Sequence, residues 1–416
     1  MTTTRPTIVL LGTLDTKGHE IAYLNDKIRE SGLRTCVLDT GILGEAVGID
    51  PCISRQEVAR EAGKDLDAIR NSGSRGAAVE TMMRGVAKVC RRLHTEGMCQ
   101  GAISLGGAEG AMLASAGMQV LPWGVPKLIV TPLASGRRQF GPFVGTRDVM
   151  VMHSVIDILG LNEVSRLIFD QAAGAIVGAV QAMAARTHEV RNAANRVVGL
   201  TMLGNTNTAV EAIKQTLDAK GFAPIIFHSN GVGGGAMEEM IRDGRIGAVV
   251  DYTTDELTDH LVGGFHDAGA GRLEAAGRAG LPQVIVPGCV DFFVQGPRSA
   301  IPVQWRHRPA YFHNPSFTLI RTSRDEMLDV AKCMAGKLNL AKGPVVVVIP
   351  TAGLSIPNCP GGEFWDPEGD AAFRDVLKRT LARRIRYIEV DAHINAKPMV
   401  DAVLRAFFEI VPESIN

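Results

Sequence analysis

The stretch Thr7-Ile8-Val9-Leu10-Leu11-Gly12-Thr13-Leu14-Asp15-Thr16-Lys17-Gly18 decides the fold of this 416-residue chain. Its apolar half predicts a buried parallel strand. A helix with an apolar face follows the polar turn, and Gly32 stands where such a helix ends. A second apolar run, residues 34–38, predicts the next strand. Strand, helix and strand together predict a βαβ unit.

The polar turn of this unit is a candidate anion-binding loop. It includes Gly12 and lies at the N-terminus of the helix, where backbone N–H groups and the positive end of the helix dipole attract anions. Lys17 adds a positive charge, Thr13 and Thr16 add hydroxyls, and Asp15 adds a candidate metal ligand. The loop matches neither the P-loop nor G-x-G-x-x-G, so by itself it fits a simple turn equally well.

Two further features near the same predicted sheet edge support a ligand site. Gly106-Gly107 directly follow a third predicted strand, residues 101–105, and precede a helix. Asp39 ends the second strand, where the ribose-binding acid lies in many doubly wound folds. An ordinary turn role before Gly41 explains Asp39 equally well.

The unit recurs in the second half of the chain. From Arg196 the sequence reads RVVGLTMLGNTNTAVEAIKQTLDAKGFAPIIFHSNGVGGG, and placing Gly221 on Gly32 aligns both strands, the polar turn and the helix. We therefore predict an α/β protein with two Rossmann-like, doubly wound parallel-sheet subdomains, residues 1–190 and 191–416, facing a cleft. The second polar turn supplies Gly204, Asn205 and Asn207 as candidate substrate-binding residues.

Other segments give weaker expectations. Residues 54–69 and 77–94 predict two helices, and the alanine-rich residues 163–186 predict a long helix packed between the halves. Residues 287–315 look irregular. The cationic segment that follows offers His313, Asn314 and Arg321 for binding a carboxylate or phosphate in the cleft, although a solvated loop with paired arginines also fits.

His260 and His266 lie six residues apart with Asp255, Asp259 and Asp267 nearby. This is not the i, i+4 spacing of two metal ligands on one helix face. The pattern therefore favours an ordinary surface segment.

Composition bounds the function. Lys+Arg and Asp+Glu both number 44, so the formal net charge is zero and no general nucleic-acid or membrane surface is expected. Seven scattered cysteines without a C-x-x-C pattern predict reduced thiols in a cytoplasmic protein.

Several motifs together resemble the Tm-1-like ATP-binding family: GTLDTKG, LGGAEG, TDELTDHLVGG, RLEAAGRAGLPQVIVPG and HNPSFTLIRT. The resemblance covers almost the whole chain. It implies paired Rossmann-like subdomains, ATP binding and a homodimer. A plant member carries a further TIM-barrel-like region, so a separate TIM-barrel protein is an expected partner.

These expectations leave two classes of function open. In the first, the chain is an enzyme that uses ATP on a small anionic metabolite. Lys17 and the glycine loops hold the phosphates, Mg²⁺ lies between Asp15 and the phosphates, and the segment around His313 holds the substrate. In the second, ATP orders a non-catalytic binding module. The sequence names no catalytic residue for either.

Overall fold

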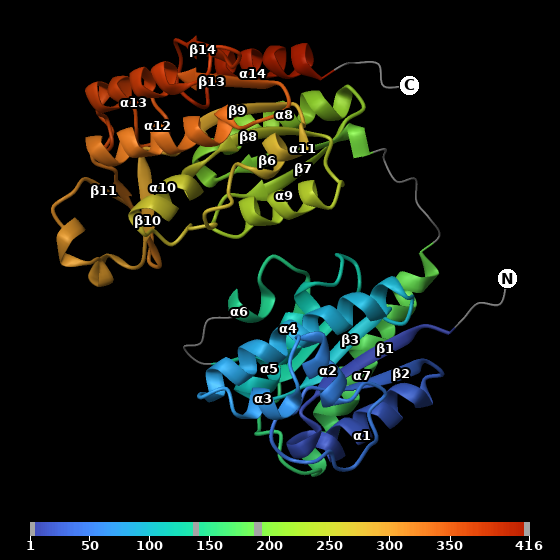
Figure 1. The fold of residues 1–416 in the computed structure, drawn as a ribbon. Helices are drawn as coiled ribbons and strands as arrows, with labels where there is room; N and C mark the ends of the chain where they lie inside the picture. Colours follow the sequence, from blue (N-terminus) through green and yellow to red (C-terminus); the bar gives the residue numbers. More distant parts are fainter. Residues whose placement is uncertain (1–4, 136–140, 187–193, 412–416) are drawn as a thin grey trace. The chain divides into compact units, whose positions relative to one another are not determined.

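The computed structural model describes residues 5–135, 141–186 and 194–411. The chain divides into two compact units, Met1–Glu189 and Val190–Asn416, which we describe separately as unit 1 and unit 2 (Figure 1).

Unit 1 contains a five-stranded parallel sheet with the strand order β2-β1-β3-β4-β5. The strands are β1 (Thr7–Gly12), β2 (Arg34–Asp39), β3 (Gly101–Leu105), β4 (Lys127–Thr131) and β5 (Val149–His153). The helices are α1 (Leu14–Glu30), α2 (Arg55–Glu61), α3 (Leu66–Arg70), α4 (Arg75–Thr95), α5 (Ala108–Gln119), α6 (Gly141–Val144) and α7 (Glu163–Ala185). The order of strands reverses between β1 and β3, as the doubly wound prediction requires.

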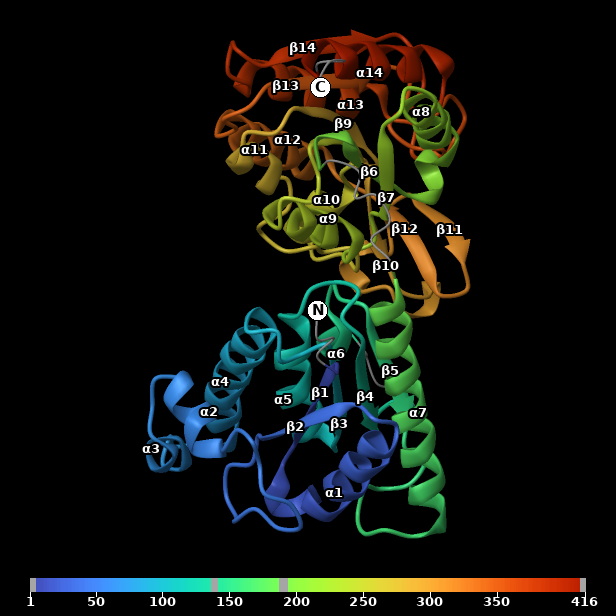
Figure 2. The same cartoon turned by 90° about the vertical axis from the view of Figure 1, so that its right-hand side faces the viewer.

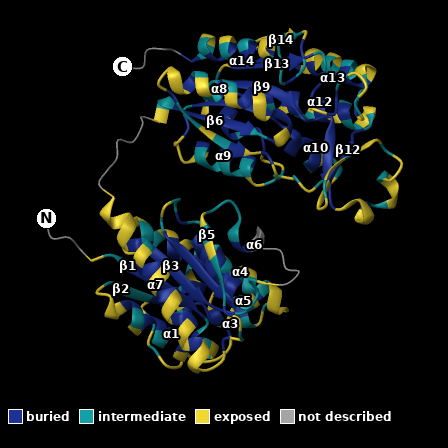
Figure 3. Ribbon diagram, turned by 180° about the vertical axis from the view of Figure 1, so that it is seen from behind, coloured by how far each residue is buried: buried dark blue, intermediate teal, exposed yellow. Residues whose placement is uncertain are grey.

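Both faces of this sheet are covered, because the side chains of β1 alternate between two cores. Ile8 and Leu10 pack with α1 and α7, whereas Val9 and Leu11 pack with α4 and α5. Figure 2 shows α1 and α7 on one side of the sheet and α4 and α5 on the other. The central strands β1 and β3 are buried in Figure 3. Every residue of β1 is buried, so its unbroken apolar run suits a central parallel strand.

Three local expectations for unit 1 need correction. The predicted helix 54–69 is interrupted between α2 and α3, where Gly63 adopts a left-handed φ of +83° that a helix cannot contain. The edge strand β5 was not predicted. Helix α7 packs on the sheet of unit 1 through residues such as Phe169 and Ile176, so its buried face forms part of this unit's own core, which the sequence did not predict.

Helix α7 is also the one helix, among the described residues, that is long and apolar enough to cross a membrane by length and composition alone. Its buried face packs on the sheet, as in core helices of water-soluble α/β domains.

Unit 2 contains a six-stranded parallel sheet with the order β14-β13-β9-β8-β6-β7 and a three-stranded antiparallel sheet with the order β10-β12-β11. The parallel strands are β6 (Val197–Met202), β7 (Ala223–His228), β8 (Ala248–Thr253), β9 (Gln283–Gly288), β13 (Val345–Pro350) and β14 (Arg386–Val390). The antiparallel strands are β10 (Phe292–Gln295), β11 (Ala310–Asn314) and β12 (Phe317–Arg321). Strands β10 and β11 of this small sheet interrupt the irregular stretch expected over residues 287–315.

The helices of unit 2 cover both faces of its parallel sheet. They are α8 (Asn207–Ala219), α9 (Gly233–Arg242), α10 (Asp255–Val262), α11 (Ala275–Ala279), α12 (Arg324–Asn339), α13 (Pro367–Thr380) and α14 (Lys397–Ile410). Helices α8 and α14 share one core, and α10, α12 and α13 share another. Both units are therefore doubly wound parallel α/β folds, which confirms the predicted fold class.

Candidate functional site

A pocket of about 850 Å³ lies at the carboxyl end of the sheet in unit 1. Segments that follow β1, β2 and β3 line it, together with the first turns of α4. It therefore lies at the point where the strand order reverses, which is where doubly wound folds bind ligands. The predicted site residues Thr13, Asp15, Thr16, Lys17 and Gly107 all line this pocket.

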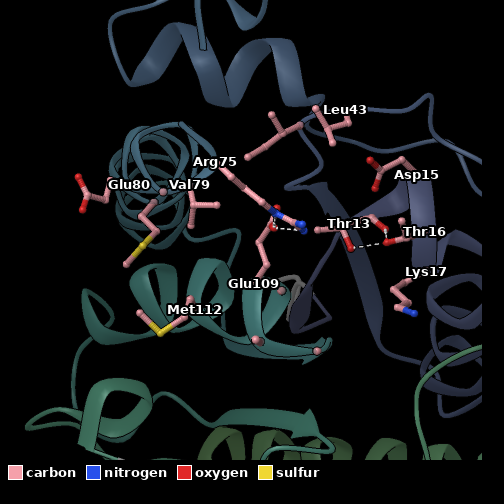
Figure 4. A pocket seen from close by; sticks show the side chains of 16 residues that line it. Thr13, Asp15, Thr16, Lys17, Leu43, Arg75, Val79, Glu80, Glu109 and Met112 are labelled. Atoms are coloured by element: carbon pink, nitrogen blue, oxygen red, sulfur yellow. Dashed lines mark hydrogen bonds and ion pairs between the residues drawn. The ribbon is translucent and has the colours of Figure 1, made fainter. Parts of the chain in front are cut away.

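The loop after β1 forms one wall (Figure 4). Thr13 is the N-cap residue of α1, and its side chain makes no capping hydrogen bond. Instead, the hydroxyls of Thr13 and Thr16 are hydrogen bonded to each other at 2.9 Å. Two hydroxyl groups at an uncapped helix N-terminus can turn toward a bound anion or its metal ion.

Asp15 holds the loop after β2 against this wall and keeps one oxygen free. Its Oδ2 accepts a hydrogen bond from the N–H of Gly44 at 3.0 Å. Its Oδ1 is buried and has no hydrogen-bond partner among the residues that the structure describes. A buried carboxylate oxygen without a partner is costly, so a cation or a hydrogen-bond donor would be stabilised there.

The loop after β3 forms the neighbouring wall. Gly106 must be glycine, because a Cβ would lie 2.9 Å from the backbone of Gly110. Gly107 is the N-cap of α5, without a side-chain cap, and a Cβ on it would meet nothing within 4 Å. The N-terminus of α5 therefore faces open space in the pocket, where its unpaired N–H groups suit an anion.

An ion pair joins α4 to the first turn of α5 beside this wall. Arg75 Nε donates to Glu109 Oε2 at 2.7 Å, and the arginine side chain is 79% exposed (Figure 4). Because an exposed ion pair is weakly held, Arg75 can exchange Glu109 for another anion at little cost.

The far wall is apolar. Leu43, from the loop after β2, lies across the pocket from Val79 of α4 and Met112 of α5 (Figure 4), and Met83 of α4 also lines it. The pocket thus has a polar side built from helix N-termini and an apolar side built from branched and thioether side chains. Such a division suits a ligand with an anionic end and a flat apolar end.

Two predicted residues have other partners in the structure. Lys17 lines the pocket, but its ammonium group donates a hydrogen bond to the carbonyl oxygen of Ile158. Asp39 is buried, forms an ion pair with Arg55 at 2.8 Å and accepts the N–H groups of Leu14 and Gly41. It does not line the pocket. Asp39 therefore holds the polar loop in place from beneath.

The predicted residues of the second polar turn form structural contacts in unit 2. Gly204 begins a short 3₁₀ turn, and the buried Asn205 accepts the N–H of Ile356 at 3.1 Å. Asn207 begins α8 and donates to Glu211 at 3.0 Å.

The cationic segment is divided by the hairpin that contains it. His313 is exposed on β11, and Asn314 closes the turn to β12 by accepting the N–H groups of Ser316 and Phe317. Arg321, at the end of β12, is buried and donates to Asp370 at 2.7 Å. His313 is exposed, whereas Arg321 is buried against the carboxyl of Asp370. The structure therefore does not bring the two side chains to one surface. Whether any of them reaches a shared cleft stays a prediction.

The sequence-based expectation of a surface around His266 is wrong. Asp255 and Asp259 are fully buried, and His266 Nδ1 lies 2.9 Å from Asp255 Oδ2. Nearby, the fully buried Arg272 pairs with Asp251 and Glu256, each at 2.6 Å. Five consecutive residues of α10, from Asp255, are buried, and no helical or strand period predicts such a run.

The structure also supplies pocket residues that the sequence did not single out. Arg75, Val79, Met83 and Met112 come from helices whose role the sequence left open. In the sequence these residues show only the spacing of an amphipathic helix. That spacing is equally typical of a helix whose apolar face packs in a core. Among the described residues no group of three or more His, Cys, Asp or Glu side chains is arranged to hold a metal ion. Asp15 is therefore a candidate metal ligand that belongs to no such group among the described residues.

Comparison with known proteins gives the family. Residues 6–185 match the N-terminal domain, and residues 195–411 the C-terminal domain, of the uncharacterised protein family UPF0261. A UPF0261 protein of Clostridium tetani is 38% identical over 97% of this chain and 98% of its own length. The ToMV resistance protein Tm-1(GCR237) of Solanum lycopersicum is 32% identical over 98% of this chain, which spans 56% of the tomato protein.

Among solved structures, the Streptomyces sp. SF2575 glycosyltransferase SsfS6, complexed with thymidine diphosphate, is 13% identical with a TM-score of 0.17. That likeness covers 68% of this chain and 82% of the glycosyltransferase. The two family models and the full-length relatives agree with the motifs found in the sequence. The chain belongs to the UPF0261 family and is a Tm-1-like protein.

Proposed function

We propose that the pocket of unit 1 binds a nucleotide, with ATP as the expected ligand. One observation carries the proposal: the N-termini of α1 and α5, whose own N-cap residues Thr13 and Gly107 make no side-chain cap, line one pocket at the switch point of a doubly wound sheet. Phosphates bind at such N-termini because free N–H groups and the helix dipole both favour negative charge.

The polar and apolar sides of the pocket give the proposed orientation of the nucleotide. The phosphates lie against Thr13 and Gly107, and the base lies against Leu43, Val79 and Met112. The volume of about 850 Å³ falls in the range of small-molecule sites, roughly 300–1,000 Å³.

The charges of the pocket favour a nucleotide that arrives with Mg²⁺. Asp15, Glu80 and Glu109 oppose Lys17 and Arg75 among the lining residues, so the pocket does not by itself neutralise a triphosphate. Mg²⁺ is commonly held by one or two carboxylates together with substrate phosphates. Asp15, which lines the pocket, is the carboxylate that we assign to that role.

Two uses of the nucleotide are compatible with this site. In one, the protein transfers a group from ATP to a small metabolite. In the other, ATP orders the pocket and no bond is broken. The binding function is the proposal, and catalysis is its extension. Release of ADP or phosphate on addition of candidate metabolites distinguishes the two.

Titration calorimetry of the full-length protein with ATP, with and without Mg²⁺, tests the binding proposal. We expect saturable binding that is tighter with Mg²⁺, and an Asp15→Asn variant whose affinity no longer depends on Mg²⁺. Asp26→Asn, an exposed substitution on the same helix, should leave both affinities unchanged. Absence of ATP binding by the native protein would refute the proposal.

We also place the protein in the cytoplasm, because all seven cysteines are free thiols in the structure. The homodimer and the separate TIM-barrel partner stay predictions.

A further inference from the structure

A second group of chemically active side chains lies in unit 2, at the carboxyl ends of β7 and β8. His228 is the last residue of β7, and Asp255 begins α10 directly after β8. His266 lies in the loop after α10. This group belongs to a different unit from the nucleotide pocket, so the inference below does not depend on the proposed function.

His266 is held in one orientation by α10. Its Nδ1 lies 2.9 Å from Oδ2 of the fully buried Asp255. Its main-chain N–H donates to Oδ1 of the equally buried Asp259 at 2.9 Å, and that oxygen also accepts the N–H of Val294 at 3.0 Å. The second ring nitrogen, Nε2, has no hydrogen-bond partner within the described part of the chain. A ring fixed at Nδ1 by a buried carboxylate, with Nε2 left over, is the arrangement of a proton-transferring histidine.

The loop after β7 brings His228 to the same place. Gly231, with a φ of +87°, packs so closely on His266 that a Cβ would lie 3.0 Å from the carbonyl carbon of that residue. The N–H of Gly231 donates to Glu256 of α10 at 2.9 Å, which fixes the loop to the helix. His228 begins this loop, and its exposed ring makes no hydrogen bond with the described residues.

Two buried oxygens of the carboxyls beside His266 have no hydrogen-bond partner in the described part of the chain. They are Oδ1 of Asp255 and Oδ2 of Asp259, and both residues are fully buried. The other oxygen of each carboxyl contacts His266. Because buried polar atoms are nearly always satisfied in folded proteins, these two unsatisfied oxygens mark a functional group of side chains.

The surroundings shift the pKa values of the two imidazoles in opposite directions. Burial lowers the pKa of His266, but its hydrogen bond to Asp255 and the charges of Asp255, Asp259 and Glu256 outweigh burial and raise the pKa above its ordinary value. Burial and the nearby charge of His266 lower the pKa of His228 against a smaller opposing effect of Asp255. Burial and the charge of Asp255 raise the pKa of Asp259. Neighbouring groups whose acidities are separated in this way can act as an acid and a base together.

We propose that His228 and His266 form the proton-transfer pair of a second site, in unit 2, that acts on a neutral hydroxy-carbonyl compound. Neutral His228 takes the proton from the carbon beside the carbonyl, and the electron pair of that C–H bond forms the C=C bond of an enol. The carbonyl oxygen takes the proton of Nε2–H from His266. The step needs no oxidant or further reactant. The carboxyl of Asp255, which contacts His266, disfavours an anionic substrate at this position.

Chemical modification of the full-length protein tests the assignment of roles. Diethyl pyrocarbonate acylates neutral imidazole only, and mass spectrometry locates the product. At pH 7 we expect His228 to react and His266 to resist. In Asp255→Asn, His266 loses the hydrogen bond and the charge that favour its protonated form, so it should react faster than in the native protein. Equal reaction of the two histidines in the native protein would overturn the assignment.

Deuterium exchange tests the chemistry, with dihydroxyacetone in D₂O as the probe and ¹H NMR as the readout. The native protein should accelerate loss of the C–H signals, and His228→Asn and His266→Asn should each reduce that rate about a hundredfold, at the low end of general acid–base contributions. His260→Asn is the matched control, because His260 also pairs with an aspartate, Asp267, at 2.8 Å but lies on the exposed side of the segment. A native rate equal to the uncatalysed rate, or equal losses in all three variants, refutes the proposal. ATP titrations of the same variants keep this result separate from the nucleotide site.

Discussion

Lys17 lies in the first turn of α1, and its ammonium group already has a partner, the carbonyl oxygen of Ile158. A phosphate at the N-terminus of α1 would offer the lysine a charged acceptor, and hydrogen bonds between charged groups are stronger than those to a neutral carbonyl. The lysine can therefore exchange partners when the nucleotide binds. Its role in the free protein, tying α1 to the segment before α7, is compatible with a role in binding.

Replacement of this lysine measures its share of binding. Lys17→Ala should weaken ATP binding by roughly 1.5–3 kcal/mol, the usual range for a hydrogen bond to a charged group. That loss corresponds to about ten- to more than a hundredfold in affinity, measured by titration calorimetry. Lys27→Ala, on the exposed side of the same helix, is the control. Equal affinities for Lys17→Ala and the native protein would mean that the lysine keeps Ile158 as its partner throughout.

Helix ends are the elements whose local chemistry is simplest. Ser323 and Glu326 form a complete capping box at the start of α12, in which the serine oxygen accepts the N–H of Glu326 at 3.3 Å and the glutamate accepts the N–H of Ser323 at 2.7 Å. Helix α12 packs along the core of unit 2 through Val330 and Met334. The cap therefore stabilises the start of a helix that packs on the parallel sheet of unit 2.

Loss of this cap should lower the free energy of unfolding of unit 2. Ser323→Ala removes the acceptor for the N–H of Glu326, and loss of an N-cap typically costs about 1 kcal/mol. Urea denaturation followed by circular dichroism measures the change. Ser316→Ala, an exposed turn position, should leave the midpoint unchanged. A Ser323→Ala midpoint equal to the native one would show that the cap is dispensable.

Elements were predictable from the sequence where their signals are local. Gly32 and Gly221 end their helices with φ values of +83° and +77°, and the capping box at Ser323 stands where the sequence placed it. The hairpin β11–β12 was missed because antiparallel pairing depends on contacts between residues apart in sequence. The ion pair of Asp39 with Arg55 was missed for the same reason. The pocket was predicted on its β1 and β3 sides, whereas its α4 wall required the fold.

At the scale of the whole molecule, buried carboxyls in unit 2 make its stability depend on pH. Burial chiefly raises the pKa of the fully buried Asp291 to about 6, against the charge of Arg321. The folded state thus binds a proton more tightly than the unfolded chain. The stabilisation is complete below the unfolded pKa near 4 and is lost as the pH rises through about 6.

We therefore expect this carboxyl to make unit 2 more stable at pH 4.5 than at pH 7. Its contribution is on the order of 2 kcal/mol, because one pKa unit corresponds to about 1.4 kcal/mol. Scanning calorimetry at both pH values, on native protein and Asp291→Asn, isolates the effect. The variant keeps an oxygen for Ser355 but no longer titrates, so its pH dependence should be flatter. Identical pH dependence of the two proteins would contradict the assignment.

The central claim is that an anionic ligand end lies at the N-terminus of α5. Gly107 allows a matched test, because its backbone is extended, with φ −70° and ψ −157°, and a Cβ on it meets nothing within 4 Å. Asparagine and aspartate are both good N-cap residues and nearly equal in size, so both variants should fold as stably as the native protein. They differ only in charge at the proposed phosphate position.

The decisive measurement is the affinity for ATP with Mg²⁺ of Gly107→Asn and Gly107→Asp, compared by titration calorimetry. We predict that the asparagine variant binds ATP and that the aspartate variant binds at least about a hundredfold more weakly, a difference of about 2.7 kcal/mol. Equal affinities of the two variants would place the phosphates away from α5 and contradict the account.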